Sequence, residues 1–282
     1  MPRQDERAFE LYRVGRYAEA LPMYEAVAKI NPQSDVYRAY VGLILFALHR
    51  SNEARTAISQ SVAINPQSAI GIAAQARLLL RDKRYEEALQ LAQRAITIDP
   101  TCAEAHYARA MALAGMTNFS QALSVIDDAL AADPTLIQSI ALKGRLLTRL
   151  ERYTDGVHTC QRATQLAPQM AIAWEDLAMA YTFDEQLRQA LQAITTALRI
   201  DPQDPTAWVI KAGIHNALRQ NVAAMAALRK AKELDPTDDV AQEMQGLIGQ
   251  DMKDDTKRLG TAVGKGVLAM IVAMVRAIFS SF

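Results

Sequence analysis

Side chains that could carry out catalysis are few in this sequence, and they stand apart from one another. The chain contains four histidines and two cysteines: His49, His106, His158, His215, Cys102 and Cys160. None of them shows metal-ligand spacing, and neither a Ser–His–Asp or Cys–His arrangement nor a Gly-rich phosphate loop is recognisable. We therefore expect no catalytic residue, no cofactor and no metal, and we predict that the protein is not an enzyme.

Composition restricts the partners. The 31 Lys and Arg residues equal the 31 Asp and Glu residues, so no net positive field attracts nucleic acid, and none is expected as a partner. The cysteines show no disulfide-type pattern, and the charged N-terminus lacks the apolar core of a secretory signal. A cytoplasmic location is the expectation.

Regularly spaced prolines reveal the elements that position every other side chain. Each of the following is separated from the next by 34 residues, as in 66 − 32: Pro32, Pro66, Pro100, Pro134, Pro168, Pro202 and Pro236. A fixed period of this length indicates one supersecondary unit that stacks on its neighbours. The predicted units within 1–238 are 1–34, 35–68, 69–102, 103–136, 137–170, 171–204 and 205–238.

Each unit is predicted to hold two amphipathic helices, because its apolar residues recur three and four apart. Proline ends the second helix, and no segment alternates with the period of a strand. Small residues stand at the eighth and twentieth places of every unit, where two helix backbones approach most closely. They are Ala8, Gly42, Ala76, Ala110, Gly144, Ala178 and Ala212, then Ala20, Ala54, Ala88, Ala122, Gly156, Ala190 and Ala224.

These residues resemble the tetratricopeptide repeat family over about residues 1–238. Tyr or Phe at the seventeenth place (Tyr17, Tyr85, Phe119 and Tyr153) and Trp174 and Trp208 at the fourth place strengthen the resemblance. It implies an all-α, right-handed α-solenoid of seven 34-residue helix-turn-helix repeats. Residues 239–252 resemble the capping helix that closes such arrays, and 253–258 form a charged linker.

The resemblance also implies a binding face, because ligands of this family commonly lie against the first helix of each unit. The corresponding places supply a candidate peptide-binding set: Arg77, Arg81, Tyr107, Met111, Arg145, Arg149, Glu175, Met179 and Phe183. The two arginines of each pair, Arg77 with Arg81 and Arg145 with Arg149, are four residues apart and so share a helical face. They are predicted to bind a carboxylate there, and the alternative is that they are simply solvated. The carboxylate clamp of chaperone-binding relatives is not predicted, since only Arg77 fits it.

The C-terminal residues 259–282 are apolar with a basic stripe and are predicted to form an amphipathic tail helix. The segment 253–282 has five basic and two acidic residues, a net charge of +3. Its candidate membrane or partner contacts are Val263, Lys265, Val267, Met270, Ile271, Met274, Arg276 and Ile278. Three interpretations stay open: an interfacial membrane helix, a helix packed on the array or on another copy, and a membrane span.

The sequence thus predicts a non-enzymatic adaptor or scaffold that binds a protein or peptide on the concave face of the array. Its tail would tether it to an anionic membrane surface. The alternative is a self-assembling structural scaffold, a homo-oligomer joined through the tail. The sequence does not name the partner.

Overall fold

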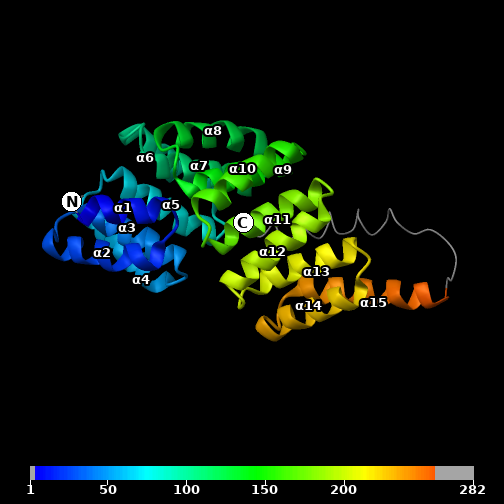
Figure 1. Cartoon of the computed structure of the whole chain (residues 1–282). Helices are drawn as coiled ribbons and strands as arrows, with labels where there is room; N and C mark the ends of the chain where they lie inside the picture. Colours follow the sequence, from blue (N-terminus) through cyan, green and yellow to red (C-terminus); the bar gives the residue numbers. More distant parts are fainter. Residues whose placement is uncertain (1–3, 258–282) are drawn as a thin grey trace. The chain divides into compact units, whose positions relative to one another are not determined.

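The computed structural model describes residues 4–257, with side chains described through Gly249. In this range the chain is all-helical, with fifteen α-helices and no strand (Figure 1). The predicted fold class is therefore confirmed as all-α. The described chain divides into two compact units, residues 4–152 with 165–167 and residues 153–164 with 168–257, and each is described separately below.

The first unit contains four helix pairs and one further helix. Its helices are α1 (Gln4–Arg13), α2 (Tyr17–Ile30), α3 (Asp35–Ala47), α4 (Ser51–Ile64), α5 (Ala69–Arg81), α6 (Tyr85–Ile98), α7 (Ala103–Gly115), α8 (Phe119–Ala132) and α9 (Ile137–Arg149). Each of these helices packs against the next as far as α9, and the first helices α3, α5 and α7 also pack side by side. Every second helix ends before an Asn-Pro or Asp-Pro pair, as the prolines predict.

The second unit continues the same pattern. Its helices are α10 (Tyr153–Leu166), α11 (Ala171–Phe183), α12 (Leu187–Ile200), α13 (Pro205–Ala217), α14 (Asn221–Leu234) and α15 (Asp239–Lys257). Its core includes Cys160, Ile194 and Leu228, all fully or almost fully buried. Both tryptophans of the chain, Trp174 and Trp208, pack against that core.

The small residues mark the closest helix contacts. The alanines at the eighth and twentieth places are completely buried, as at Ala76 and Ala88. Gly42 packs so closely on α4 that an added Cβ would collide with the side chain of Ile58. A larger side chain at these places would force the two helices of a pair apart.

The turn inside each pair places one residue in the left-handed region. In the first pair this residue is Gly15, with φ of 75°. The other six turns use a side-chain-bearing residue at the same place: His49, Lys83, Thr117, Glu151, Glu185 and Arg219, with φ between 57° and 62°. These residues carry a backbone strain that glycine avoids.

The C-terminal helix differs from the prediction. We expected a helix over 239–252 followed by a charged linker over 253–258, but α15 continues to Lys257. The residues 253–257 contain neither Pro nor Gly, so nothing in them ends a helix. On α15, Ala241, Met244 and Ile248 are buried and pack with the core that α14 contributes to. The predicted tail, 259–282, lies outside the described residues.

Candidate functional site

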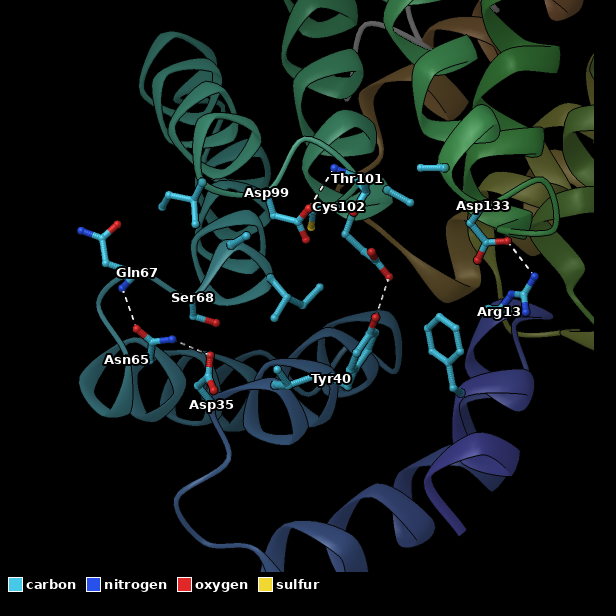
Figure 2. A pocket seen from close by; sticks show the side chains of 18 of the residues that line it. Arg13, Asp35, Tyr40, Asn65, Gln67, Ser68, Asp99, Thr101, Cys102 and Asp133 are labelled. Carbon is cyan, nitrogen blue, oxygen red and sulfur yellow. Dashed lines mark hydrogen bonds and ion pairs between the residues drawn. The ribbon is translucent and has the colours of Figure 1, made fainter. Parts of the chain in front are cut away.

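A surface pocket of about 580 Å³ lies in the first unit (Figure 2). It is formed by the end of α1, the beginnings of α3, α5 and α7, and the loop between α8 and α9. Its lining includes Phe9, Arg13, Asp35, Val36, Tyr40, Ser68, Ile70, Ile98, Asp99, Glu104 and Asp133. Its volume is in the range of pockets that hold small ligands or inserted side chains.

Two Asp-Pro-Thr turns form part of the wall. In each, the Asp side chain accepts hydrogen bonds from the Thr two residues later. Asp99 Oδ1 accepts from the Thr101 backbone N–H at 2.9 Å and from its hydroxyl at 2.7 Å. Asp133 Oδ1 accepts from both Thr135 donors at 2.9 Å. Because proline ends the preceding helix there, the turn holds each carboxylate at the start of the next unit.

An ion pair connects α1 with the loop before α9. Arg13 Nη2 lies 2.8 Å from Asp133 Oδ1, and the same nitrogen donates to the Thr135 hydroxyl. The Arg13 guanidinium also stacks on Phe9, with 5.4 Å between Cζ and the ring centroid. Figure 2 shows Arg13 and Asp133 together at one side of the pocket, away from Asn65 and Asp35. The first helix pair is thereby attached to the beginning of the fifth.

Glu104 is the most buried acid of the pocket, with 6% of its surface exposed. Its Oε1 accepts a hydrogen bond from the Tyr40 hydroxyl at 3.3 Å. Burial raises the pKa of Glu104, while Arg77 lowers it through its charge. Asp35 is less buried, and its Oδ2 accepts from the Asn65 amide at 3.2 Å. The wall therefore combines an acid in a poorly solvated place with acids nearer to water.

Arg77 is the centre of a buried network behind the pocket. Its Nη1 donates to Gln138 Oε1 at 2.7 Å, and the Gln138 amide donates to the Tyr17 hydroxyl at 2.5 Å. The guanidinium lies between two rings, with Cζ 5.3 Å from the centroid of Phe46 and 5.1 Å from that of Tyr107. Burial raises the pKa of Tyr17 to about 12, so this hydroxyl stays protonated. The network holds α2, α3, α5, α7 and α9 together.

Aromatic rings fill the space between α1, α2 and α3. Tyr40 lies 5.0 Å from Tyr12, 5.1 Å from Tyr24 and 5.5 Å from Phe9, measured between ring centroids. Tyr12 and Tyr24 are almost fully buried. A cluster of this kind contributes both buried apolar area and ring–ring contacts to the stability of the unit. The face that the family resemblance assigns to ligands is here occupied, in part, by the protein's own side chains.

The structure brings some predicted peptide-binding residues together and separates others. Arg77 and Tyr107 are in contact and buried, whereas Arg81 is exposed and donates to the Ser51 hydroxyl. Arg77 and Arg81 therefore do not form a matched exposed pair. Arg149 is half-buried against the ring of Phe119, at 5.7 Å. Met111 and Arg145 are half-buried as well.

The predicted residues of the second unit lie on α11. Met179 is buried in the core, and Phe183 stacks on Tyr153 with 5.9 Å between centroids. Glu175 is 8% exposed, and burial raises its pKa to about 9, with the charge of Asp204 as the next cause. As peptide-binding residues, the set stays a prediction.

Sequence reasoning missed the pocket residues Arg13, Tyr40, Asp99, Glu104 and Asp133. The recurrence of Asp-Pro-Thr was a visible signal for Asp99 and Asp133, because the turn positions a carboxylate in a known way. Nothing in the sequence indicates that residues 120 positions apart, Arg13 and Asp133, form an ion pair.

The cysteine and histidine beside the pocket are buried. Among the residues that the structure describes, no group of His, Cys, Asp and Glu could hold a metal ion. Burial raises the pKa of the Cys102 thiol to about 12, which disfavours the reactive thiolate. His106 places its Nε2 2.8 Å from the carbonyl of Pro100 and is buried. These groups are held by the fold.

Sequence comparison identifies the family. One tetratricopeptide repeat model matches residues 79–146, and another matches 6–69, 42–103 and 183–239. The chain therefore belongs to the tetratricopeptide repeat family, as its residues indicated. No curated protein matches the sequence.

Several solved structures share the fold. The crystal structure of the APC/C hetero-tetramer Cut9–Hcn1 is similar with a TM-score of 0.69 and 16% identity, covering 84% of this chain and 47% of that one. PilF of Pseudomonas aeruginosa is similar with a TM-score of 0.57 and 13% identity, covering 78% of this chain and 97% of that one. MamA (41-end) from Desulfovibrio magneticus RS-1 is similar with a TM-score of 0.51 and 24% identity, covering 61% of this chain and 97% of that one. This chain thus spans about half of the Cut9–Hcn1 chain, and at these identities the likeness shows the fold alone.

Proposed function

We propose that this protein is a non-enzymatic adaptor that binds segments of partner proteins, and that the pocket of the first unit is a contact point. Tetratricopeptide repeat proteins generally mediate protein–protein interactions, which supports the class of function. The observation that carries the proposal is the pocket itself, with apolar and charged side chains converging on about 580 Å³.

The proposal includes the architecture that the sequence predicts. Helices α1 to α14 supply two helices for each 34-residue unit, which supports seven repeats within 1–238, stacked as a right-handed solenoid. Helix α15 buries Ala241 and Met244 and leaves Gln242 and Glu243 exposed, which supports a closing role. The boundaries between repeats belong to the same proposal.

Among the predicted peptide-binding residues, Arg81 and the half-buried Met111, Arg145 and Phe183 are the better candidates for direct contact. Arg77 is engaged with Gln138 and two rings, so replacing it would disturb the fold as well as any binding. A binding test of this set should therefore use Arg81, whose exposed side chain can be removed at little structural cost.

The membrane tether and the self-assembling alternative both depend on residues 259–282, which lie outside the described residues. Within residues 4–257, no helix has the length and apolar character required to cross a membrane. The tail contacts, the anionic membrane surface, the homo-oligomer and the cytoplasmic location stay predictions from the sequence.

A photo-crosslinking experiment in native host cells tests the adaptor function. A benzophenone amino acid replaces Val36, which lies at the pocket and is 41% exposed, in the full-length protein. The matched control carries it at Val222 on α14, which is 75% exposed. We expect discrete protein adducts from position 36 that position 222 does not form. An absence of protein adducts at position 36, or identical adducts at both positions, would contradict the proposal.

A further inference from the structure

The charged side chains of the pocket are unequal in sign. Four acids line it, Asp35, Asp99, Glu104 and Asp133, against one cation, Arg13. Arg13 is already engaged, because its guanidinium lies 2.8 Å from Asp133. When all of these groups are ionised, the lining carries a net charge of −3.

Helix N-termini at the pocket contribute positive charge. The size of that charge decides whether the pocket stays negative. The starts of α3, α5 and α7 each present roughly half a positive charge. Asp35 already lies in the first turn of α3 and Glu104 in that of α7. At α5 the Ser68 hydroxyl accepts from the Gly71 N–H at 3.1 Å. The three helix ends therefore offset only about half of the acidic excess.

Glu104 independently favours a cation in the pocket. Its carboxyl is more than nine-tenths buried, lines the pocket, and accepts one side-chain hydrogen bond, from the neutral hydroxyl of Tyr40. In the described part of the chain it forms no ion pair. The buried Arg77 acts on this carboxyl through its charge, but its guanidinium donates to Gln138 and lies between the rings of Phe46 and Tyr107. Because burial of a carboxylate is unfavourable, a second cation that enters from the pocket would stabilise its ionised form further.

The walls next to these acids are apolar and aromatic. Phe9 and Tyr40 meet edge to face with their centroids 5.5 Å apart, and Ile70 and Ile98 also line the pocket. The stem of an arginine or lysine packs on such surfaces while its charged end reaches polar groups. The ring faces attract a cation as well.

We propose that the pocket binds an arginine or lysine side chain from a partner protein, with its cationic end at the carboxyls of Asp99 and Glu104 and its stem against Phe9 and Tyr40. This inference rests on the proposed adaptor function and adds the chemical class of the partner segment.

Matched turns provide the variants. Asp99→Asn removes one charge and keeps the oxygen that accepts from Thr101, and the same loop position holds Asn31 and Asn65 in other units. Asp235→Asn makes the identical change in the Asp-Pro-Thr turn after α14, where Asp235 accepts from Thr237 at 2.9 Å outside the pocket. The two variants differ in location alone.

The experiment uses the immobilised full-length protein and a hexapeptide library in which one position is fixed as Arg, Lys, citrulline or Glu. We expect Arg and Lys peptides to be retained and neutral citrulline peptides to bind roughly tenfold more weakly, as loss of a charge-assisted contact predicts. For the best Arg peptide, Asp99→Asn should weaken binding by about the same factor while Asp235→Asn leaves it unchanged. Equal retention of Arg and citrulline peptides, retention of Glu peptides, or no retention would overturn the inference.

Two further comparisons separate the adaptor function from the charge assignment, and a partner protein from the protein's own tail. If the crosslinks at position 36 persist while Arg and citrulline peptides bind equally, the adaptor function stands and the charge assignment is wrong. A full-length variant with Arg258→Gln, Lys265→Gln and Arg276→Gln tests the protein's own tail as the source of the cation. Unchanged peptide affinity in this variant supports a partner as the source, and tighter binding would overturn that assignment in favour of the tail.

Discussion

The first and second units use the same helix pair in different ways. In the first unit, side-chain hydrogen bonds join residues far apart in the chain, as between Arg77 and Gln138 or Tyr40 and Glu104. In the second unit the described bonds are more local, as between Gln161 on α10 and Tyr181 on the next helix, α11. One unit is closed by long-range contacts across its first helices, and the other is stabilised by contacts between neighbouring helices.

This difference shows that the repeat determines the helical scaffold, while a few side chains determine which contacts the first helices make. The first unit contains seven of the nine tyrosines: Tyr12, Tyr17, Tyr24, Tyr37, Tyr40, Tyr85 and Tyr107. Five of them lie on α1 to α3, where they supply rings and hydroxyls that the second unit lacks at these places. Because both tryptophans lie in the second unit, tryptophan fluorescence reports that unit, while most of the tyrosine signal comes from the first unit.

The largest predicted effect is a pH dependence of the second unit. The pKa of Glu175 is raised to about 9 from 4.5, so the folded state keeps a proton that the unfolded state loses between these values. The contribution of Glu175 to the stability of this unit should be fully present below pH 4.5 and should be lost as the pH rises toward 9, by up to about 1.4 kcal/mol per pH unit. Urea unfolding followed by tryptophan fluorescence measures it.

The control for this effect is Glu175→Gln, which cannot ionise. It should flatten the pH dependence of the fluorescence-detected transition, whereas Glu104→Gln in the first unit should leave that transition unchanged. A stability difference between the wild type and Glu175→Gln that does not change with pH across this window would contradict the raised pKa of Glu175.

A smaller loss of stability is expected when the buried Arg77 network of the first unit is removed. Arg77→Ala removes a charged hydrogen bond to Gln138 and two ring contacts and leaves a cavity, at a cost of about 3 kcal/mol. The tyrosine circular dichroism in the near ultraviolet should show the loss, while the tryptophan transition stays in place. Arg81→Ala on the same helix is exposed and should cost less than about 0.5 kcal/mol. Equal effects of the two variants would exclude a special role for the buried network.

The smallest expected change in stability comes from relieving backbone strain in a turn. Lys83 has φ of 57° in the turn between α5 and α6, where the first pair has Gly15. Lys83→Gly should therefore stabilise the first unit by roughly 1 kcal/mol. Gln90→Gly, in the middle of α6, should destabilise it by a similar amount. Thermal unfolding of both variants checks the sign, and destabilisation by Lys83→Gly would show that the turn is not strained.

The fold could be predicted because its signals are local. Proline ends each second helix, and alanine or glycine marks each close approach, so helix positions follow from residues within one unit. The candidate binding face was less predictable. Arg77 looked like an exposed partner of Arg81, yet neighbouring rings and Gln138 enclose it. Spacing within a helix shows which side chains share a face and not what covers that face.

The sequence by itself determined the helical units, their period and the family, because each depends on interactions within one unit or between adjacent ones. The tertiary structure alone decided that Arg13 meets Asp133 and that Asp99 and Glu104 line one pocket with Phe9. The reason is geometric: small rotations from each repeat to the next accumulate along the stack, and only their sum brings residues of the first pair to those of the fifth.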